Sequence, residues 1–527
     1  MSRRAGPLPR ELVRRVAARP WLVSFLLFAA LEIVWLTATP LFGAPDEPSH
    51  VIRAAAVARG QLVGHSHPRA PGYFQFVHVP SSLVKAGNHP PADPRAYIPC
   101  FALVSNVLPS CFGELPARHG ERTVPTDVGL DPPAYYAVVG LPSLVGAGSH
   151  PARTVYLMRL LSALLCAALL ASAVMTLRDL RPLWVGASGL AFALTPAALF
   201  FGGVVSPNGF EICAGIAAWV SVAVLAHDAD DHVDVKVLRR AGIAMIALVL
   251  ARGLSPLWLA LLLLTAVALT TSRGRRRLVA SGAVRRWAAA VAGATVLAVV
   301  YILVEHPLTQ LTGHGPLPLP SESVLAIART SLGSMMQQYQ QMIGVFGWLD
   351  TGSPSLTYLL WTAGLVLIVG GCLALVARRY AAVVVGLVAL SVVVPVALDT
   401  SQARRVGIGW EGRWTLAFAV GVPIVAALSV AWDHRRALLN ASRLPLILAT
   451  IFVVAQFLAF GQYLRRVTVG AAGSLTFWLH PHWSPPLPAW LLLGGALVLL
   501  VALAAWLFQP GEWLTPSEPA IDAAAVE

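Results

Sequence analysis

Two adjacent carboxylates stand where the first apolar run of the chain ends. The stretch FGAPDEPSHVIRAAAVARG, residues 42–60, contains Asp46 and Glu47, followed by His50 and Arg53. Asp46 can cap a short helix, and helical spacing then places it on one face with His50 and Arg53. Adjacent carboxylates at a hydrocarbon boundary are costly unless something positive or protic reaches them. We interpret the pair as functional; the alternative, a helix cap with solvated charges, accounts best for Arg53.

Two other motifs place polar groups beside apolar runs. GLDPPAYYAVVG adds a third carboxylate, Asp131, ahead of Tyr135 and Tyr136, which could equally form an aromatic belt at the membrane surface. GGVVSPNGFEICAG adds Asn208 and Glu211, close to a helix start that favours a negative charge. Helix capping explains these two side chains in part, but not their position between two wholly apolar runs.

Arginines gather in a fourth motif, DTSQARRVGIGWEGRWTLAF, which contains Arg404, Arg405 and Arg413. Arginine offers phosphate bidentate, charge-assisted hydrogen bonds, so a lipid phosphate is the expected ligand. The alternative is contact with anionic headgroups. In SMMQQYQQMIGVFGWLD, Trp348 and Asp350 suit stacking on a sugar and hydrogen bonding to it, or else belong to an amphipathic interface helix.

The composition is that of a polytopic membrane protein. Of 527 residues, 57% are hydrophobic and 12% charged, and the mean hydropathy is +0.70. The net charge of +13 comes from short arginine clusters between apolar runs, without the aromatic-lined basic face of a nucleic-acid-binding protein. We therefore exclude nucleic acid as a partner and expect the charge to set topology and to contact membrane lipids.

The five cysteines show no metal-ligand spacing. Cys166, Cys213 and Cys372 lie inside apolar runs and are expected in the core. Cys100 and Cys111 share one long polar loop, which would allow a disulfide in an oxidising compartment. No cofactor is assigned, although a divalent cation remains open and its ligands are unknown.

Apolar runs predict an all-α protein with about twelve transmembrane helices. The stretch 238–271 has about twice spanning length and is broken by ARGLSP, so it counts as two helices. The segment 132–148 is short and rich in proline and is expected to lie in the interface without crossing. The ten other predicted spans are 21–41, 154–177, 183–204, 210–227, 285–304, 355–377, 380–398, 414–432, 444–463 and 489–508.

Basic residues orient these spans. With both termini cytoplasmic, the inner segments hold roughly three times as many Lys and Arg residues as the short outer ones. The first extracytoplasmic loop is then 42–152 and the second large one 305–354, within a single transmembrane domain, 1–527. Residues 509–527 are expected to form a disordered cytoplasmic tail.

The order of the motifs resembles a known family. PDEPSH after the first span, DPPAYY, SPNGFE, GWLDT and GRW together resemble the DUF2142 family of bacterial membrane proteins, over nearly the whole chain. That family in turn resembles the GT-C superfamily of glycosyltransferases, which use polyprenyl-phosphate sugars. The resemblance places the GT-C acidic motif on Asp46 and Glu47, and the late GRY motif on Gly412 and Arg413, with Trp414 replacing tyrosine.

The resemblance implies an inverting glycosyltransferase of the bacterial plasma membrane with an extracytoplasmic active site. It would move a hexose or pentose from a polyprenyl-phosphate donor to an envelope glycan or lipid. Asp46 would be the base, Glu47 would orient it or hold a metal, and the arginines would bind the phosphate. Two alternatives stay open: a transporter or flippase of lipid-linked or small polar precursors, for which Arg252 could break a helix in the membrane, and a non-catalytic scaffold.

Overall fold

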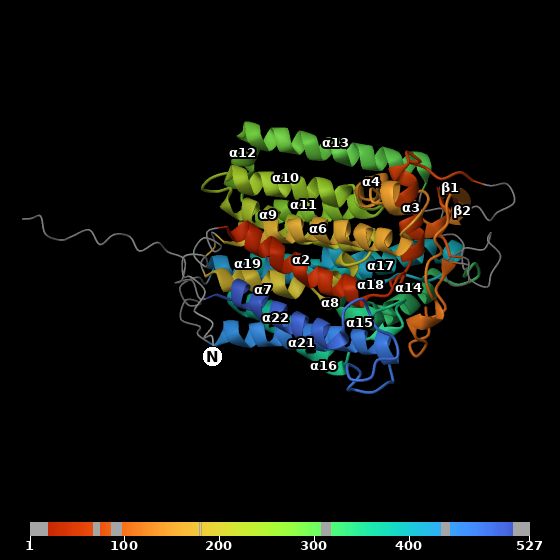
Figure 1. Ribbon diagram of the computed structural model, residues 1–527. Coiled ribbons are helices and arrows are strands. Elements are labelled where there is room, and N and C mark those ends of the chain that lie inside the picture. Colours follow the sequence, from red (N-terminus) through yellow and green to blue (C-terminus); the bar gives the residue numbers. More distant parts are fainter. Residues whose placement is uncertain are drawn as a thin grey trace, which may run out of the picture.

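A bundle of long helices forms the body of the protein (Figure 1). The computed structural model describes residues 19–66, 74–85, 97–178, 180, 182–306, 318–433 and 443–509. Within these ranges helices predominate, as predicted, and the two sheets have two strands each. The predicted tail, 509–527, lies outside the described residues apart from its first position.

Nine helices of the described ranges are long and apolar enough to cross a membrane. Two further pairs of helices are bent at a short break, and the number of spans reaches eleven at most if each pair counts as one span. The pairs are α7 (Leu183–Ala193) with α8 (Pro196–Gly202), bent by 67°, and α11 (Ser255–Leu269) with α12 (Ser272–Ala280), bent by 120°. The nine are α2 (Pro20–Ala38), α6 (Pro151–Leu177), α9 (Pro207–Asp228), α13 (Gly282–Glu305), α16 (Ser355–Leu375), α17 (Arg378–Val406), the joined α18 (Gly412–Ala419) and α19 (Gly421–Asp433), α21 (Leu444–Val469) and α22 (Ala489–Leu507).

The predicted number of twelve differs from this count at α10 (Val235–Val249). The break at ARGLSP divides the long apolar stretch as predicted, but α10 keeps only 15 residues. Such a helix is about 22 Å long, which is shorter than a hydrocarbon core of about 30 Å. It nevertheless returns to the end at which α9 starts, because Arg252, just after α10, contacts Asn208 in the first turn of α9. Figure 1 shows α10 lying between α9 and α13, against which it packs.

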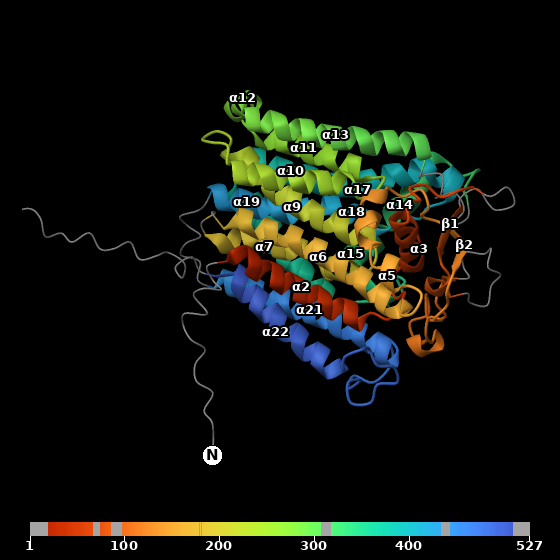
Figure 2. The same cartoon turned by 45° about the horizontal axis from the view of Figure 1, so that its top comes forward.

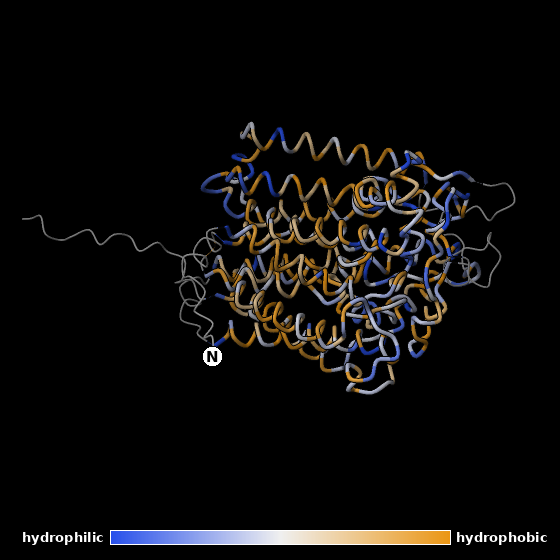
Figure 3. Tube along the Cα trace, viewed as in Figure 1, coloured by the Kyte–Doolittle hydropathy of each residue, from blue (hydrophilic) through white to orange (hydrophobic). Residues whose placement is uncertain are grey.

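The helices run side by side, and the polar loops gather at the two ends of the bundle (Figures 1 and 2). Figure 3 shows hydrophobic residues along the middle and hydrophilic ones toward both ends. α2 and α22 are antiparallel, because the Trp506 indole donates to the Ser24 hydroxyl at 2.9 Å. The start of α2 and the end of α22 therefore lie at the same end of the bundle.

The opposite end, here called the α3 end, carries the loops with the predicted site residues. It holds α3 (Glu47–Ala58) and the strands β1 (Gln75–Pro80) and β2 (Glu121–Thr126), which pair antiparallel. The segment 132–148 forms two short helices that pack on α3 and α6 and do not cross, as expected. The other elements are η1 (Ser81–Leu83), η3 (Pro109–Cys111), α4 (Pro133–Val139), α5 (Ser143–Gly146), α14 (Val324–Gly333), α15 (Met335–Gly344), β3 (Val345–Phe346) and β4 (Thr351–Gly352).

The core is centred on α9, which is apolar and buried on nearly all of its faces. A helix that is hydrophobic all round belongs in the interior of a bundle. By contrast, α13 buries few side chains and lies at the edge of the bundle in Figure 1. Because α9 is held in the core, its start at the α3 end has a fixed position. The loops of that end attach to this fixed point.

Candidate functional site

Asp46 and Arg413 meet at the α3 end of the bundle. Asp46 precedes α3, and Arg413 lies in the first turn of α18; a guanidinium nitrogen of Arg413 donates to Asp46 Oδ2 at 2.6 Å. The Asp46 side chain is 35% exposed, whereas that of Arg413 is only 4% exposed. One side of the contact therefore opens to solvent and the other is held in the protein.

Arg413 has donor capacity that this contact does not use. Its Nη1 atom has no hydrogen-bond partner among the described residues, and its Nε atom forms an ion pair with Glu411. Burial raises the pKa of the Glu411 carboxyl, and the charge of Arg413 acts against this. An anion that reached Arg413 could thus accept a hydrogen bond that the protein leaves unmade.

The backbone around Arg413 is fixed by a close approach of α18 to α15. The Gly412 N–H donates to Gln341 Oε1 at 2.7 Å. A Cβ atom on Gly412 would lie 2.2 Å from the carbonyl oxygen of Gln338, so only glycine fits. The sequence GRW therefore places its arginine by means of the glycine before it.

Glu47 is fully buried and bound to Arg159 of α6. Nε and Nη2 of Arg159 donate to the two carboxylate oxygens at 2.7 Å each, and the Val205 N–H donates to Glu47 Oε1 at 3.1 Å. Arg159 also donates to the carbonyls of Thr39 and Pro40 at 2.7 Å. Glu47 thus joins α3 to α6 and, through Arg159, to the end of α2.

His50, Tyr136 and Asp131 form a hydrogen-bonded chain. The Tyr136 hydroxyl donates to Asp131 Oδ2 at 3.0 Å, and His50 Nδ1 lies 2.9 Å from the same hydroxyl. Because the hydroxyl proton is directed to Asp131, His50 Nδ1 carries the proton of the second bond. Burial lowers the pKa of His50 to about 3; Asp46 raises it, and Arg413 and Arg252 lower it further. His50 is therefore a neutral group at neutral pH.

Burial also raises the pKa of Asp131, while Arg252, the Tyr136 hydroxyl and Arg53 lower it. The Arg53 guanidinium is buried and donates to the carbonyls of Leu62 and Asp131 at 2.7 Å each. It joins α3 to both ends of the first loop. Arg53 thus has a positioning role, and its full burial contradicts the expectation of a solvated charge at this position.

Asn208 and Glu211 converge on Arg252, which lies between α10 and α11. Arg252 Nη1 donates to Asn208 Oδ1 at 2.6 Å and lies 3.6 Å from Glu211 Oε2. The Ser255 hydroxyl donates to Glu211 Oε1 at 2.7 Å. Arg252 is also an electrostatic neighbour of His50 and Glu411. We call Asp46, His50, Arg252, Glu411 and Arg413 the Asp46 cluster.

Other predicted site residues have structural contacts of their own. Asp350 forms a buried ion pair with Arg466 at 2.9 Å, and the Trp348 indole donates to the Phe42 carbonyl at 3.0 Å. The buried Tyr135 hydroxyl lies 2.9 Å from that of Ser162. These contacts tie the second large loop and α4 to the bundle.

Arg404 and Arg405 are exposed at the end of α17, and Arg404 donates to the Glu322 carbonyl at 3.3 Å. Among the three predicted phosphate ligands, Arg413 is thus buried and contacts Asp46, whereas Arg404 and Arg405 are exposed. Cys100 and Cys111 form a disulfide in the first loop, and the three other cysteines are free and buried.

Three residues of this end were not expected from the sequence: Arg159, Glu411 and Arg466. Arg159 stands alone in the apolar run TVYLMRLLSALL, and an unpaired charge there would be costly. This position inside an apolar run predicts an acidic partner for Arg159. It does not name Glu47, which lies 112 positions away.

The family model described as "Predicted membrane protein (DUF2142)" matches residues 28–422. The chain belongs to the DUF2142 family. No curated protein matches the chain. The DUF2142 region runs from within α2 to within α19, so it contains the Asp46 cluster and the Glu47–Arg159 pair, whereas Arg466 lies beyond it.

The Asp46 cluster of this DUF2142 protein combines a half-exposed carboxylate with two guanidinium groups, at the end of an apolar bundle. A carboxylate can accept a proton from a hydroxyl group, and guanidinium groups stabilise a phosphate that gains charge. The arrangement suits a reaction at the membrane surface in which a phosphate leaves.

Proposed function

We propose that the protein is an inverting glycosyltransferase that moves a hexosyl or pentosyl unit from a polyprenyl-phosphate donor to a cell-envelope glycan or lipid. The observation that carries the proposal is the contact between the half-exposed Asp46 carboxylate and the buried Arg413 guanidinium, whose Nη1 atom has no hydrogen-bond partner among the described residues. Base and phosphate ligand are thereby adjacent, as a displacement at an anomeric carbon requires.

In the proposed reaction, the oxygen of an acceptor hydroxyl forms a bond to the anomeric carbon of the donor sugar. The bond from that carbon to the phosphate oxygen breaks, and its electron pair leaves with the phosphate. The hydroxyl proton goes to Asp46. A single displacement inverts the anomeric centre, and no strong general acid is needed because a phosphate is already a good leaving group.

Arg413 would stabilise the departing phosphate with its unused donor. Arg252, whose charge also acts on His50, is the second cation of the Asp46 cluster, and we assign it to the phosphate in place of the exposed Arg404 and Arg405. Movement of Arg413 from Asp46 to the phosphate would leave the carboxylate available to the acceptor hydroxyl. Donor binding would then prepare the base.

The remaining residues would shape and hold the site. His50, Tyr136 and Asp131 would position the polar wall of α3 and α4 beside the acceptor. Glu47 would act through Arg159, by fixing the start of α3, and would not touch substrate. A divalent cation is not needed for this scheme.

The site would face the outside of a bacterial plasma membrane. The disulfide Cys100–Cys111 lies at the α3 end, and disulfides persist in oxidising compartments, which supports this orientation. Both termini would then be cytoplasmic. Lipid-linked sugars present their phosphate at the membrane surface, where hydrophilic residues replace hydrophobic ones in Figure 3.

Purified protein in detergent or vesicles, incubated with labelled polyprenyl-phosphate sugars and envelope extracts, tests the proposal. We expect label on the acceptor with an inverted anomeric centre. A transporter or flippase is favoured by one observation, the charged pair of Arg252 with Glu211 at a helix break. It would carry labelled lipid across the bilayer and leave the sugar on the lipid.

A further inference from the structure

A buried carboxylate inside the bundle lacks the partners that such a group requires. Glu32 of α2 is fully buried, and among the residues that the structure describes neither of its oxygens has a hydrogen-bond partner. The buried arginine of the neighbouring helix α6, Arg159, is already bound to Glu47. It also lies about 10 Å along α6 from Cys166, the residue of that helix beside Glu32. A buried charge without a partner is strongly unfavourable, so Glu32 calls for a cation or a proton.

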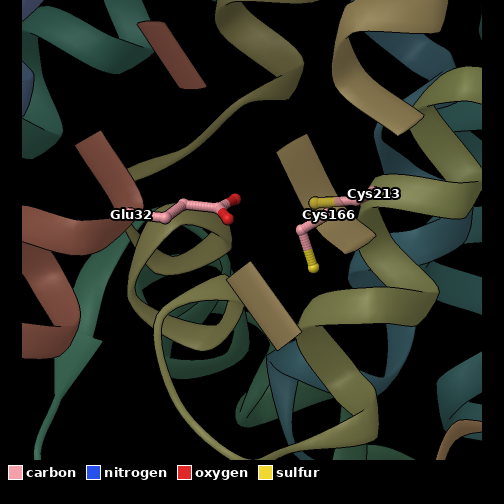
Figure 4. Close-up of side chains that lie close together, drawn as sticks. All are labelled: Glu32, Cys166 and Cys213. Atoms are coloured by element: carbon pink, nitrogen blue, oxygen red, sulfur yellow. The ribbon is translucent and has the colours of Figure 1, made fainter. Parts of the chain in front are cut away.

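Two thiols lie beside this carboxylate. Ligand atoms of Glu32, Cys166 and Cys213 all lie within 4.8 Å of one another, and all three residues are buried. Figure 4 shows the Glu32 carboxylate directed toward Cys213, with Cys166 next to it. The three residues come from α2, α6 and α9, three helices that pack together in the core.

We propose that Glu32, Cys166 and Cys213 bind one thiophilic divalent metal ion, with Zn²⁺ as the expected occupant. Two thiolates and one carboxylate oxygen supply three of the four ligand atoms of a tetrahedral zinc site, and the fourth position is left for a water molecule. Bonds of about 2.3 Å to sulfur place two sulfur atoms about 3.8 Å apart in a tetrahedron, which falls inside the 4.8 Å within which the ligand atoms lie.

Charge and softness restrict the choice of ion. Three deprotonated ligands carry three negative charges, so a divalent ion leaves one of them uncompensated in the core and a monovalent ion leaves two. Thiolates select zinc and other soft metals over Mg²⁺ and Ca²⁺. Binding releases a proton from each thiol, so affinity should fall as the pH is lowered.

A glycine makes room for the carboxylate. A Cβ atom on Gly202 of α8 would lie 2.6 Å from Glu32 Oε1. Glu32 is six residues before the end of α2, and Cys213 six residues after the start of α9, which is about 9 Å along each axis. A bound metal would thus join the two helix ends that lead to Asp46 and Asn208.

Metal analysis of the purified full-length protein tests the site. We expect about one Zn²⁺ per chain in the wild type and at least a tenfold loss in Glu32→Gln and in the double variant Cys166→Ser/Cys213→Ser. Cys372→Ser is the matched control, because Cys372 is also a buried free thiol but lies on α16; its zinc content should equal that of the wild type.

A spectroscopic measurement separates metal binding from folding. Protein stripped with a chelator and refilled with Co²⁺ should show a sulfur-to-cobalt charge-transfer band in the wild type and in Cys372→Ser. The band should be absent from Glu32→Gln and the double variant that elute as folded monodisperse protein. A stripped and folded wild type that takes up neither Zn²⁺ nor Co²⁺, or uptake unchanged in the variants, would overturn the proposal.

Discussion

Arg413 donates a 2.6 Å hydrogen bond to Asp46 across 367 positions of sequence. The contact joins the start of α3 to the start of α18, and both elements are held independently: α3 by Glu47 with Arg159, and α18 by Gly412 against α15. Asp46 can therefore change its protonation or its partner while the surrounding helices stay in place. The proposed role of Asp46 as a base requires this freedom, whereas Glu47 holds the fold together.

Replacement of Asp46 by asparagine should abolish sugar transfer and leave the protein folded. The amide keeps the shape of the side chain but cannot take the acceptor proton, so we expect turnover to fall by about 10²–10⁴-fold. The assay is transfer of labelled sugar, with thermal unfolding as the folding check. Glu121→Gln is the matched control, because Glu121 is an arginine-paired carboxylate at the same end of the bundle. Wild-type turnover in Asp46→Asn would remove Asp46 from the mechanism.

Replacement of Arg413 by lysine should weaken binding of the donor more than it changes folding. Lysine keeps the charge but loses the planar set of donors that serves Asp46 and a phosphate together. We expect KM for the polyprenyl-phosphate sugar to rise about tenfold or more, since a charge-assisted hydrogen bond contributes about 1.5–3 kcal/mol. Arg404→Lys, a change at an exposed site, should leave KM as it is. An equal KM in both variants would contradict the role of Arg413.

Replacement of Glu47 by glutamine should damage stability. Loss of one member of a buried ion pair leaves the charge of Arg159 uncompensated and costs about 3–5 kcal/mol. The half-exposed pair Arg59–Glu121 offers the comparison, since Glu121→Gln should cost at most about 1 kcal/mol. Thermal unfolding of the two variants in one detergent measures the difference. Equal melting temperatures would show that Glu47 has no such structural role.

Helices and their membrane character could be predicted from the sequence, because runs of apolar residues report directly on the lipid environment. Asp46, Asp131 and Asn208 are candidates because polar groups beside such runs are costly, and Arg413 because its motif gathers arginines that suit a phosphate. Their partners could not be found in this way. A hydrogen bond such as that of Arg252 to Asn208 depends on how α9 and α10 pack, and single charges do not specify their partners.

Glu32 and Arg159 show what sequence reasoning can still gain. Both are single charged residues inside apolar runs, and each demanded a partner that could have been sought among the other buried polar residues. The short length of α10 could not be predicted, for a different reason. Hydropathy measures how apolar a stretch is, but not how many residues a turn removes from its two helices.

Acid should destabilise the folded protein through His50. Its pKa is lowered by burial to about 3, below its ordinary value of about 6.5, so the unfolded chain binds a proton that the folded chain excludes. The stability is fully present above pH 6.5 and is lost as the pH falls toward 3, by about tenfold in the folding equilibrium per pH unit. Thermal unfolding of the wild type and His50→Gln between pH 7 and pH 5 checks this. The variant should lose less stability over that range, and parallel curves would contradict the prediction.

Thiol labelling should establish the side of the membrane on which the α3 end lies. After mild reduction of intact cells, a membrane-impermeant maleimide should label Cys100 and Cys111, because they form a disulfide in the first loop. Cys166, Cys213 and Cys372 are buried and should stay unlabelled, so a variant with serine at both loop positions is the background control. Labelling that requires lysis of the cells would place this loop in the cytoplasm.

The left-handed backbone at Asp46, with φ of 60°, restricts the residues that this position can hold. Asparagine and glycine tolerate such a conformation, whereas β-branched and bulky residues are strained in it. In a library of all substitutions at position 46, selection for folding alone should retain aspartate, asparagine and glycine, and selection for transfer should retain aspartate. The backbone conformation at position 46 thus limits which residues allow folding, and the proposed reaction then selects among those residues.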